Sequence, residues 1–257
     1  MFLNIKELLN AYNKHERISI TLPGFEKVAT HCVVKFISKE HNDSFISYFK
    51  LNEEEVDSAI ESEINYFSRL NKSFEWKTYD FDTPANIGEK LIQHGFVAEE
   101  SESFMVLDLD SIKSNFTESE ICVEVSDAQG IKDAISVQEE VWGSELSVKS
   151  SYLLDLKKAN PENLRVYIIY IEGKPVSSAW IVYNDNSPFA GVWGGSTIAE
   201  YRGKGYYSAL LRKRINDAKQ RGLKYLIIDA SDMSKPIVEK HGFQFVAKTT
   251  PYIFQNS

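Results

Sequence analysis

Cysteine and long apolar runs are both scarce in this sequence. Cys32 and Cys122 are its only cysteines, too few for a disulfide framework, so both are predicted to be reduced thiols. No apolar run approaches the roughly 18 residues that a transmembrane helix needs. The first residues do not read as a signal peptide, because Lys6 and Glu7 interrupt any apolar core. These absences predict a cytoplasmic globular protein with no membrane partner.

An excess of positive charge is missing as well. The chain has 29 Lys and Arg residues against 37 Asp and Glu residues, and this net charge of −8 argues against general nucleic-acid binding. Because no two of its five histidines form a close ligand pair, no metal site is predicted. The hydrophobic content of 43% is enough for a sizeable core, in one large domain or in two of ordinary size.

The tripeptide His-Gly-Phe occurs twice, at 94–96 and at 241–243. In both copies an Asp lies thirteen residues before the Gly, namely Asp82 and Asp229. Each copy alone indicates a helix that ends at a Gly and is followed by a core Phe. Two interpretations stay open: a chain built twice from one plan, or two unrelated α/β halves that end with the same common helix cap.

The C-terminal half alternates strands and helices in a clear order. Three strands joined by tight turns at 172–175 and 184–188 should be antiparallel, and a long helix should run from about Gly205 to Arg221 and stop at Gly222. Gln138 interrupts the apolar stripe of an earlier helix, which starts near Ile131. The predicted strands are 121–127, 165–171, 176–183, 189–197 and 224–229, with extended structure at 243–247 and 250–254, and the other helices are 147–158 and 234–241.

The N-terminal half ends in a similar order of elements. Its first helix is predicted from apolar residues at helical spacing, namely Phe2, Ile5, Leu8, Leu9 and Tyr12. The predicted strands are 28–38, 45–51, 74–81 and 103–109, and the predicted helices are 52–70 and 84–94. The polar stretch 110–120 is the predicted linker. The sequence therefore predicts two domains, at residues 1–115 and 120–257.

A glycine-rich turn at 200–211 joins a predicted strand to the long helix. Gly203 and Gly205 allow the backbone to approach a bulky anion, and the free N–H groups and dipole of the helix start favour negative charge there. A plain structural turn is the alternative. The P-loop pattern G-x-x-x-x-G-K-[ST] is absent, and Ser208 stands where a dinucleotide fingerprint needs its third Gly.

The region from Ile121 to Phe254 resembles the GNAT superfamily of acyl-CoA-dependent N-acetyltransferases. Arg202 and Gly205 match the family motif [Q/R]-x-x-G-x-[G/A], whose last position here holds Tyr207. The resemblance implies an α/β (α+β) fold with a mixed, largely antiparallel sheet flanked by helices. The N-terminal half then looks like a degenerate copy, as in tandem GNAT proteins, because acidic residues at 50–57 would repel a pyrophosphate.

The resemblance further implies acetyl-CoA as cosubstrate and a small-molecule amine as acceptor, in a monomer or homodimer. The pyrophosphate would lie on the loop, and the pantetheine would pair with the preceding strand, where a backbone N–H polarises the thioester carbonyl. The implied loop residues are Arg202, Gly203, Lys204, Gly205, Tyr206, Tyr207 and Ser208, and those of the strand are Gly195, Ser196, Thr197 and Ile198.

Several positions depart from the family pattern. Val238 stands where many members have a Tyr that protonates the leaving thiolate, and Ser231 and Ser234 replace an Asn and a small apolar residue. The strand before the loop, residues 189–195, offers no Glu to act as base. A non-catalytic acyl-CoA-binding module is therefore the alternative function.

Other side chains are candidates for the missing roles. Tyr252 is a candidate acid, because the final strand should run beside the two splayed parallel strands, although packing is its usual role. Glu200 and Asp229 are candidate bases, with a solvated carboxylate and a strand-end cap as the alternatives. Trp180 and Trp193 could line an acceptor pocket or pack in the core.

Overall fold

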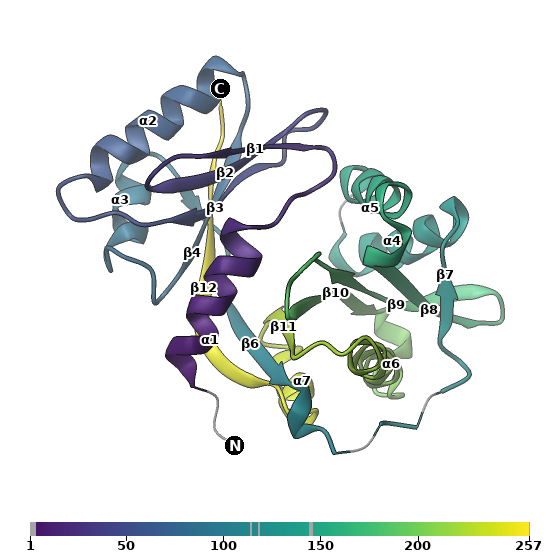
Figure 1. Ribbon diagram of the computed structural model, residues 1–257. Helices are drawn as coiled ribbons and strands as arrows, with labels where there is room; N and C mark the ends of the chain where they lie inside the picture. Colours follow the sequence, from purple (N-terminus) through teal and green to yellow (C-terminus); the bar gives the residue numbers. More distant parts are fainter. Residues whose placement is uncertain (1–3, 114, 118, 144–145, 257) are drawn as a thin grey trace. The chain divides into compact units, whose positions relative to one another are not determined.

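The computed structural model describes residues 4–113, 115–117, 119–143 and 146–256 (Figure 1). These residues separate into two compact units. Among the described residues, the C-terminal unit comprises those within 106–228 and 236–244, and the N-terminal unit comprises 4–105, 229–235 and 245–256. In the described part of the chain, no helix combines the length and apolar character that a membrane crossing requires.

The sheet of the C-terminal unit is an antiparallel meander with one parallel strand added. Its strands are β7 (Val123–Val125), β8 (Leu164–Ile171), β9 (Lys174–Tyr183), β10 (Phe189–Thr197) and β11 (Tyr225–Ala230). The order β7-β8-β9-β10 is antiparallel throughout, and β11 joins β10 in parallel. Glu172 and Gly173, with φ of 50° and 80°, form the turn between β8 and β9. The predicted hairpins are confirmed.

Helices cover both faces of this sheet (Figure 1). Residues of α4 and α5 pack in one core cluster with Val166 and Trp180. On the other face, Tyr167 of β8 donates a hydrogen bond to Asp217 of α6. The helices are α4 (Ala128–Trp142), α5 (Ser147–Ala159), α6 (Tyr206–Gln220) and α7 (Lys235–Lys240), with short 3-10 segments at Leu109–Ser111, Pro161–Asn163 and Ala199–Tyr201.

The N-terminal unit has a sheet of the same kind. Its strands are β1 (Phe25–Ala29), β2 (Val33–Ser38), β3 (Ser44–Phe49), β4 (Phe74–Tyr79), β5 (Val97–Ala98), the start of β6 (Glu102–Asp108) and most of β12 (Gln244–Phe254). Its helices are α1 (Ile5–Tyr12), which continues as a π-helix at Asn13–Ile18, α2 (Val56–Arg69) and α3 (Ile87–Gln93). As in the C-terminal unit, antiparallel strands lead to one parallel pair, here β3 and β4.

Two predictions for the strands were wrong. The predicted strand 28–38 is two strands, because Thr30 turns the chain: its Oγ1 accepts a hydrogen bond from the Val33 N–H at 3.0 Å. The final strand does not run beside either strand of the parallel pair β10 and β11. Its residues 249–254 pair antiparallel with β4 instead. Phe2 of the predicted first helix lies outside the described residues.

The two His-Gly-Phe segments have the same conformation. Gly95 and Gly242 have φ of 90° and 94°, and the N–H of the following Phe returns to a carbonyl five residues earlier in both copies. Both segments are therefore helix caps of the Schellman type, as predicted. With the shared order parallel strand, helix, parallel strand, short helix and cap, this supports the duplicated plan. The division at 1–115 and 120–257 stays a prediction. The two compact units depart from it, because residues 106–113 belong to the C-terminal unit and residues 229–235 and 245–256 belong to the N-terminal unit.

Candidate active site

The loop after β10 ends in a helix start that has no side-chain cap. Gly205 is the N-cap of α6 and, with φ of 83°, adopts a left-handed conformation; Gly203, with φ of 76°, does the same. A Cβ at either glycine would meet nothing within 4 Å, so backbone conformation rather than crowding requires glycine. The first N–H groups of α6 are thus available to an anion.

Two exposed basic residues, Arg202 and Lys204, lie on the loop directly before this helix start. Arg202 is held by a hydrogen bond of 3.0 Å from its Nε to the carbonyl of Thr197. The Nζ of Lys204 lies 4.9 Å from the centroid of the Tyr201 ring. Both cations therefore lie on the loop of a strongly acidic protein.

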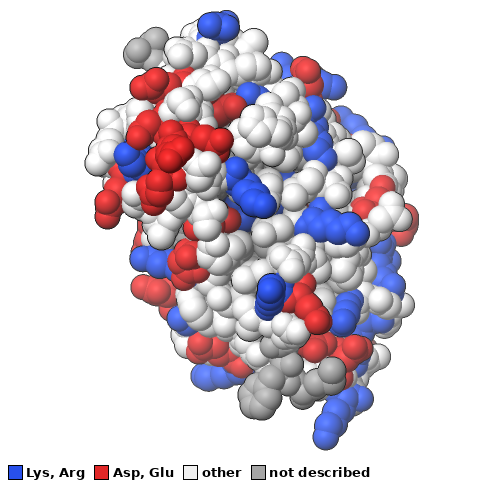
Figure 2. All heavy atoms as spheres, turned by 60° about the vertical axis from the view of Figure 1, so that its left-hand side comes forward, with Lys and Arg blue, Asp and Glu red and all other residues white. Residues whose placement is uncertain are grey.

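On one face of the molecule, acidic side chains gather in one area while Lys and Arg are dispersed (Figure 2).

The strand β10 separates from β11 before it reaches the loop. The parallel pairing covers only Phe189–Gly191 against Tyr225–Ile227, although β10 continues to Thr197. Beyond Gly191, β10 is therefore paired on the β9 side alone among the described strands, and its other edge is open there. This opening lies where the resemblance predicts that the two strands splay apart, and its use by a pantetheine arm stays a prediction.

The predicted pantetheine segment has backbone groups that face this open edge. Ser177 Oγ, on β9, donates to the Ser196 carbonyl at 2.8 Å. Because the C=O and N–H of one peptide point in opposite directions, the Thr197 N–H faces away from β9. The Ile198 N–H, in contrast, points towards β9 and donates a hydrogen bond to the Val176 carbonyl at 3.0 Å. The predicted cofactor-binding residues thus form one continuous stretch of the structure. It runs from the end of β10, at Gly195 to Ile198, through the loop to the start of α6, at Arg202 to Ser208.

Aromatic rings occupy the places where the glycines of β10 lack side chains. A Cβ at Gly194 would lie 2.0 Å from the Trp180 ring, and a Cβ at Gly191 would lie 2.1 Å from the Trp193 ring. Trp180 is buried in the core cluster, and Trp193 packs against it partly buried. The packing interpretation of these tryptophans therefore fits better than an acceptor pocket. Tyr207 contacts Gly195 in the same way, with a ring atom 2.6 Å from the place of its Cβ.

The candidate bases differ in their surroundings. Glu200 is exposed on the loop. Asp229 follows the last β11 residue of the C-terminal unit and belongs to the N-terminal unit. Its Oδ2 lies 2.6 Å from Lys77 Nζ, and its side chain is only 6% exposed. Its Oδ1 is buried without a hydrogen-bond partner.

Two further acidic residues of the N-terminal unit were missed by sequence reasoning. Burial and the nearby Asp229 carboxylate raise the pKa of Glu102 to about 7. Burial also raises the pKa of Glu75, which lies two residues from Lys77 on β4. Because side chains alternate between the two faces of a strand, the sequence could have placed Glu75 and Lys77 on the same face of β4. Nothing in the sequence, however, indicates that Glu75 and Glu102 are buried.

Tyr252 and Val238 are both packing residues in their units. Tyr252 lies opposite Trp76 on β4 and Ala98 on β5. Its ring fills the space beside Gly88, where a Cβ would lie 2.1 Å from the Tyr252 hydroxyl, and burial raises its pKa. Val238 is fully buried. The acid role of Tyr252 stays a prediction, and its contacts favour the packing alternative.

The turn before α2, the helix of the N-terminal unit that corresponds to α6, is held by Asn52, although α2 itself has no side-chain cap among the described residues. Asn52 Oδ1 accepts hydrogen bonds from the N–H groups of Glu54 and Glu55 at 3.0 and 2.9 Å, in the turn that leads into α2. Two N–H groups of this turn are thus already used, and the residues that carry them have acidic side chains. This agrees with the prediction of a degenerate copy.

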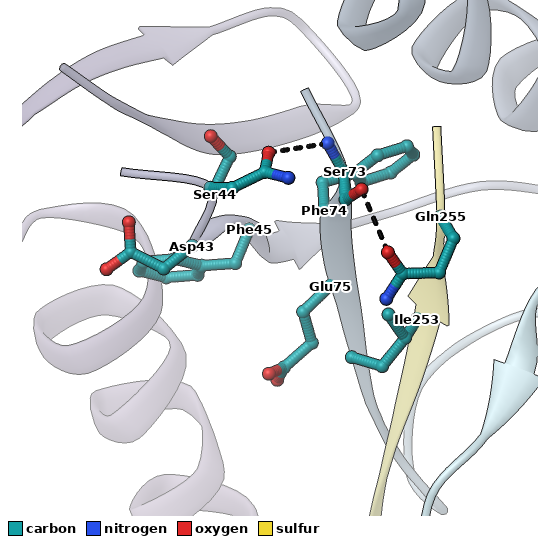
Figure 3. Close-up of a pocket in the computed structure, with 9 residues that line it drawn as sticks. Asp43, Ser44, Phe45, Ser73, Phe74, Glu75, Ile253 and Gln255 are labelled. Atoms are coloured by element: carbon teal, nitrogen blue, oxygen red, sulfur yellow. Dashed lines mark hydrogen bonds between the residues drawn. The ribbon is translucent and has the colours of Figure 1, made fainter. Parts of the chain in front are cut away.

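The N-terminal unit also has a small open cavity of about 200 Å³ (Figure 3). Ser44 and Phe74, the first residues of β3 and β4, contribute to its lining. It thus lies at the start of the parallel pair, whereas the predicted cofactor site lies where β10 ends. Among the described residues, no group of His, Cys, Asp or Glu is arranged to hold a metal ion.

Comparison with known proteins agrees with this geometry. Residues 133–243 match the model of the Acetyltransferase (GNAT) family. A search of curated proteins found no match. A GCN5-related N-acetyltransferase from Kribbella flavida has a similar structure, with a TM-score of 0.68 and 12% identity, covering 97% of this chain and 93% of the other.

Two more solved structures are similar over most of the chain. A tandem GNAT protein from the clavulanic acid biosynthesis pathway has a TM-score of 0.61 and 10% identity, covering 93% of this chain and 85% of that one. A GCN5-related N-acetyltransferase from Sphaerobacter thermophilus has a TM-score of 0.55 and 12% identity, with coverages of 97% and 84%. At these identities the likeness shows the fold alone, and the fold class is confirmed. Residues 133–243 of this chain form a domain of the GNAT acetyltransferase family.

Proposed function

We propose that this chain transfers the acetyl group of acetyl-CoA to the amine of a small molecule. The observation that carries the proposal is the uncapped start of α6, with left-handed Gly203 and Gly205, at the end of a strand whose edge is open. A bulky anion fits such a helix start, because its N–H groups and dipole both favour negative charge.

Each part of this segment has a role in the proposal. Residues Arg202 to Ser208 hold the pyrophosphate through backbone N–H groups and two cations. Residues Gly195 to Ile198 hold the pantetheine arm along the open edge, and an N–H there donates to the thioester oxygen as charge develops on it. The acceptor amine attacks the thioester carbon, and the C–S bond breaks to release the thiolate of CoA.

The acceptor must lose a proton and the thiolate must gain one. An ordinary ammonium has a pKa near 10, so a base is needed near neutral pH. Asp229 and Glu200 stay the two predicted bases: Asp229 is buried and ion-paired with Lys77 at 2.6 Å, whereas Glu200 is exposed. Since Val238 cannot donate and the contacts of Tyr252 favour packing, water supplies the thiolate proton.

A non-catalytic acyl-CoA-binding module is the second candidate. The apolar, fully buried Val238, where many family members have a Tyr, favours it. Both candidates bind CoA, but only the enzyme releases a thiol that depends on an added amine. A thiol-release assay with acetyl-CoA and a panel of small amines separates them. Turnover with one class of amine supports the enzyme, whereas CoA binding without any amine-dependent release supports the module.

A further inference from the structure

The strand β10 contains a β-bulge directly before the predicted pantetheine segment. Trp193 lies opposite Trp180 on β9, and Ser196 lies opposite Ser178, so β10 has one residue more than β9 in this interval. Gly194 has φ of 61°. A bulge interrupts the ladder and redirects the backbone groups that follow it. Its geometry therefore determines which N–H groups of β10 face the open edge.

Two buried side chains reach the carbonyls of this bulge. Gln138, on α4, donates from Nε2 to the Gly194 carbonyl at 2.5 Å. Arg214, on α6, donates from Nη1 to the Trp193 carbonyl at 3.3 Å and to the Trp180 carbonyl at the same distance. Because α4 and α6 cover opposite faces of the sheet, the bulge is held from both sides.

Arg214 is an unusual residue to bury. Its side chain is completely inaccessible, and it forms no ion pair with any described carboxylate. Its Nη2 has no hydrogen-bond partner in the part of the chain that the structure describes, and burial lowers its pKa to about 10. A buried cation without a counter-ion costs stability, and an apolar residue of similar volume would cost less. Stability alone therefore does not account for Arg214.

The two contacts act on peptide groups at the start of the open edge. A carbonyl that accepts a strong hydrogen bond makes the N–H of the same peptide a stronger donor. The Trp193 carbonyl shares its peptide with the Gly194 N–H, and the Gly194 carbonyl shares its peptide with the Gly195 N–H. Both contacts thus orient peptide groups at the start of the open edge, and the shorter one, from Gln138, also polarises the Gly195 N–H.

We infer that Gln138 and Arg214 are positioning residues for acyl transfer, which hold the bulge so that its N–H groups can donate to the thioester oxygen. The inference rests on the proposed function. Neither side chain touches the reacting atoms, so both act through the backbone of Gly194 and Gly195. Removing a donor to a developing oxyanion costs about 10²- to 10³-fold in kcat, and loosening one should cost about 10- to 100-fold.

The test compares turnover, CoA affinity and thermal stability in four variants of the full chain. Arg214→Met and Gln138→Leu remove the contacts, and Arg214→Lys restores a cation with N–H donors. Lys213→Met is the matched control, because Lys213 is the neighbouring cation on α6 and lies 3.3 Å from Asp217 rather than at the bulge. If Gln138→Leu does not fold, the near-isosteric Gln138→Glu replaces it, since a carboxylate cannot donate.

The expected result separates positioning from structure. Arg214→Met should lower kcat about 10- to 100-fold, with KM for acetyl-CoA changed less than threefold and a Tm unchanged or raised. Arg214→Lys should recover most of kcat, and Lys213→Met should keep it. If Arg214→Met and the Gln138 variant retain wild-type kcat while wild type turns over, only this inference is overturned. If wild type shows no amine-dependent thiol release, the proposed function is overturned with it.

Discussion

A single carboxylate at the start of α6 should repel CoA, and its amide counterpart provides the control. Gly205 has φ of 83° and open space around its Cβ position. Asn and Asp are the side chains that tolerate this conformation best. Gly205→Asp and Gly205→Asn therefore share the same backbone cost and nearly the same shape. They differ by one negative charge beside the bound pyrophosphate.

The size of the effect follows from Coulomb's law. For a carboxylate about 6 Å from a diphosphate of charge about −2, with an effective dielectric between about 40 and 80, the repulsion is about 1.4 to 3 kcal/mol. This corresponds to a loss of about 10- to 100-fold in affinity for the Asp variant relative to the Asn variant. The difference should shrink in about 1 M salt, where the Debye length is about 3 Å.

Calorimetric titration of both variants with CoA measures this difference directly. Thermal unfolding of the two variants should give the same Tm, because they share the backbone strain. If the Asp variant binds CoA as tightly as the Asn variant at low salt, the pyrophosphate does not bind at α6, and the assignment of the loop is wrong.

Three other outcomes are expected. Wild type should bind one CoA per chain in calorimetry, because Asn52 already caps the turn into α2; a stoichiometry of two would contradict this. Tyr252→Phe should leave kcat within about twofold, as packing against Gly88 implies, whereas a fall of about 10²-fold would assign Tyr252 the acid role. Glu102 has a folded pKa of about 7, above its ordinary value, so the folded state binds more protons and its stability falls as pH rises towards 7. Glu102→Gln should therefore raise Tm relative to wild type at pH 8 but not at pH 4, and equal shifts at both would refute the buried-carboxylate explanation.

Local signals predicted much of the fold. Glu172–Gly173 marked the turn between β8 and β9, Gly222 marked the end of α6, and the His-Gly-Phe segments marked two helix caps, because each depends on a backbone conformation that few residues adopt. Gly203 and Gly205 also need a left-handed backbone conformation, which is why the sequence alone indicated a loop that can hold an anion.

Long-range pairing and burial could not be predicted. The sequence of β12 indicates a strand but does not name its partner, so its pairing with β4 was missed. Gln138 looked like an interruption of an apolar face, yet it is buried because the Gly194 carbonyl needs a donor there. The raised pKa of Glu102 depends on burial and on Asp229, which is distant in sequence.

A single-turnover experiment tests the central claim most directly. The full chain is mixed with one equivalent of acetyl-CoA and an excess of mixed small amines, and the quenched products are identified by mass spectrometry. The account predicts that free CoA and one acetylated amine appear together in equal amounts, and that Gly205→Asp suppresses both. Acetyl-CoA that binds at the C-terminal loop but stays intact with every amine would contradict it.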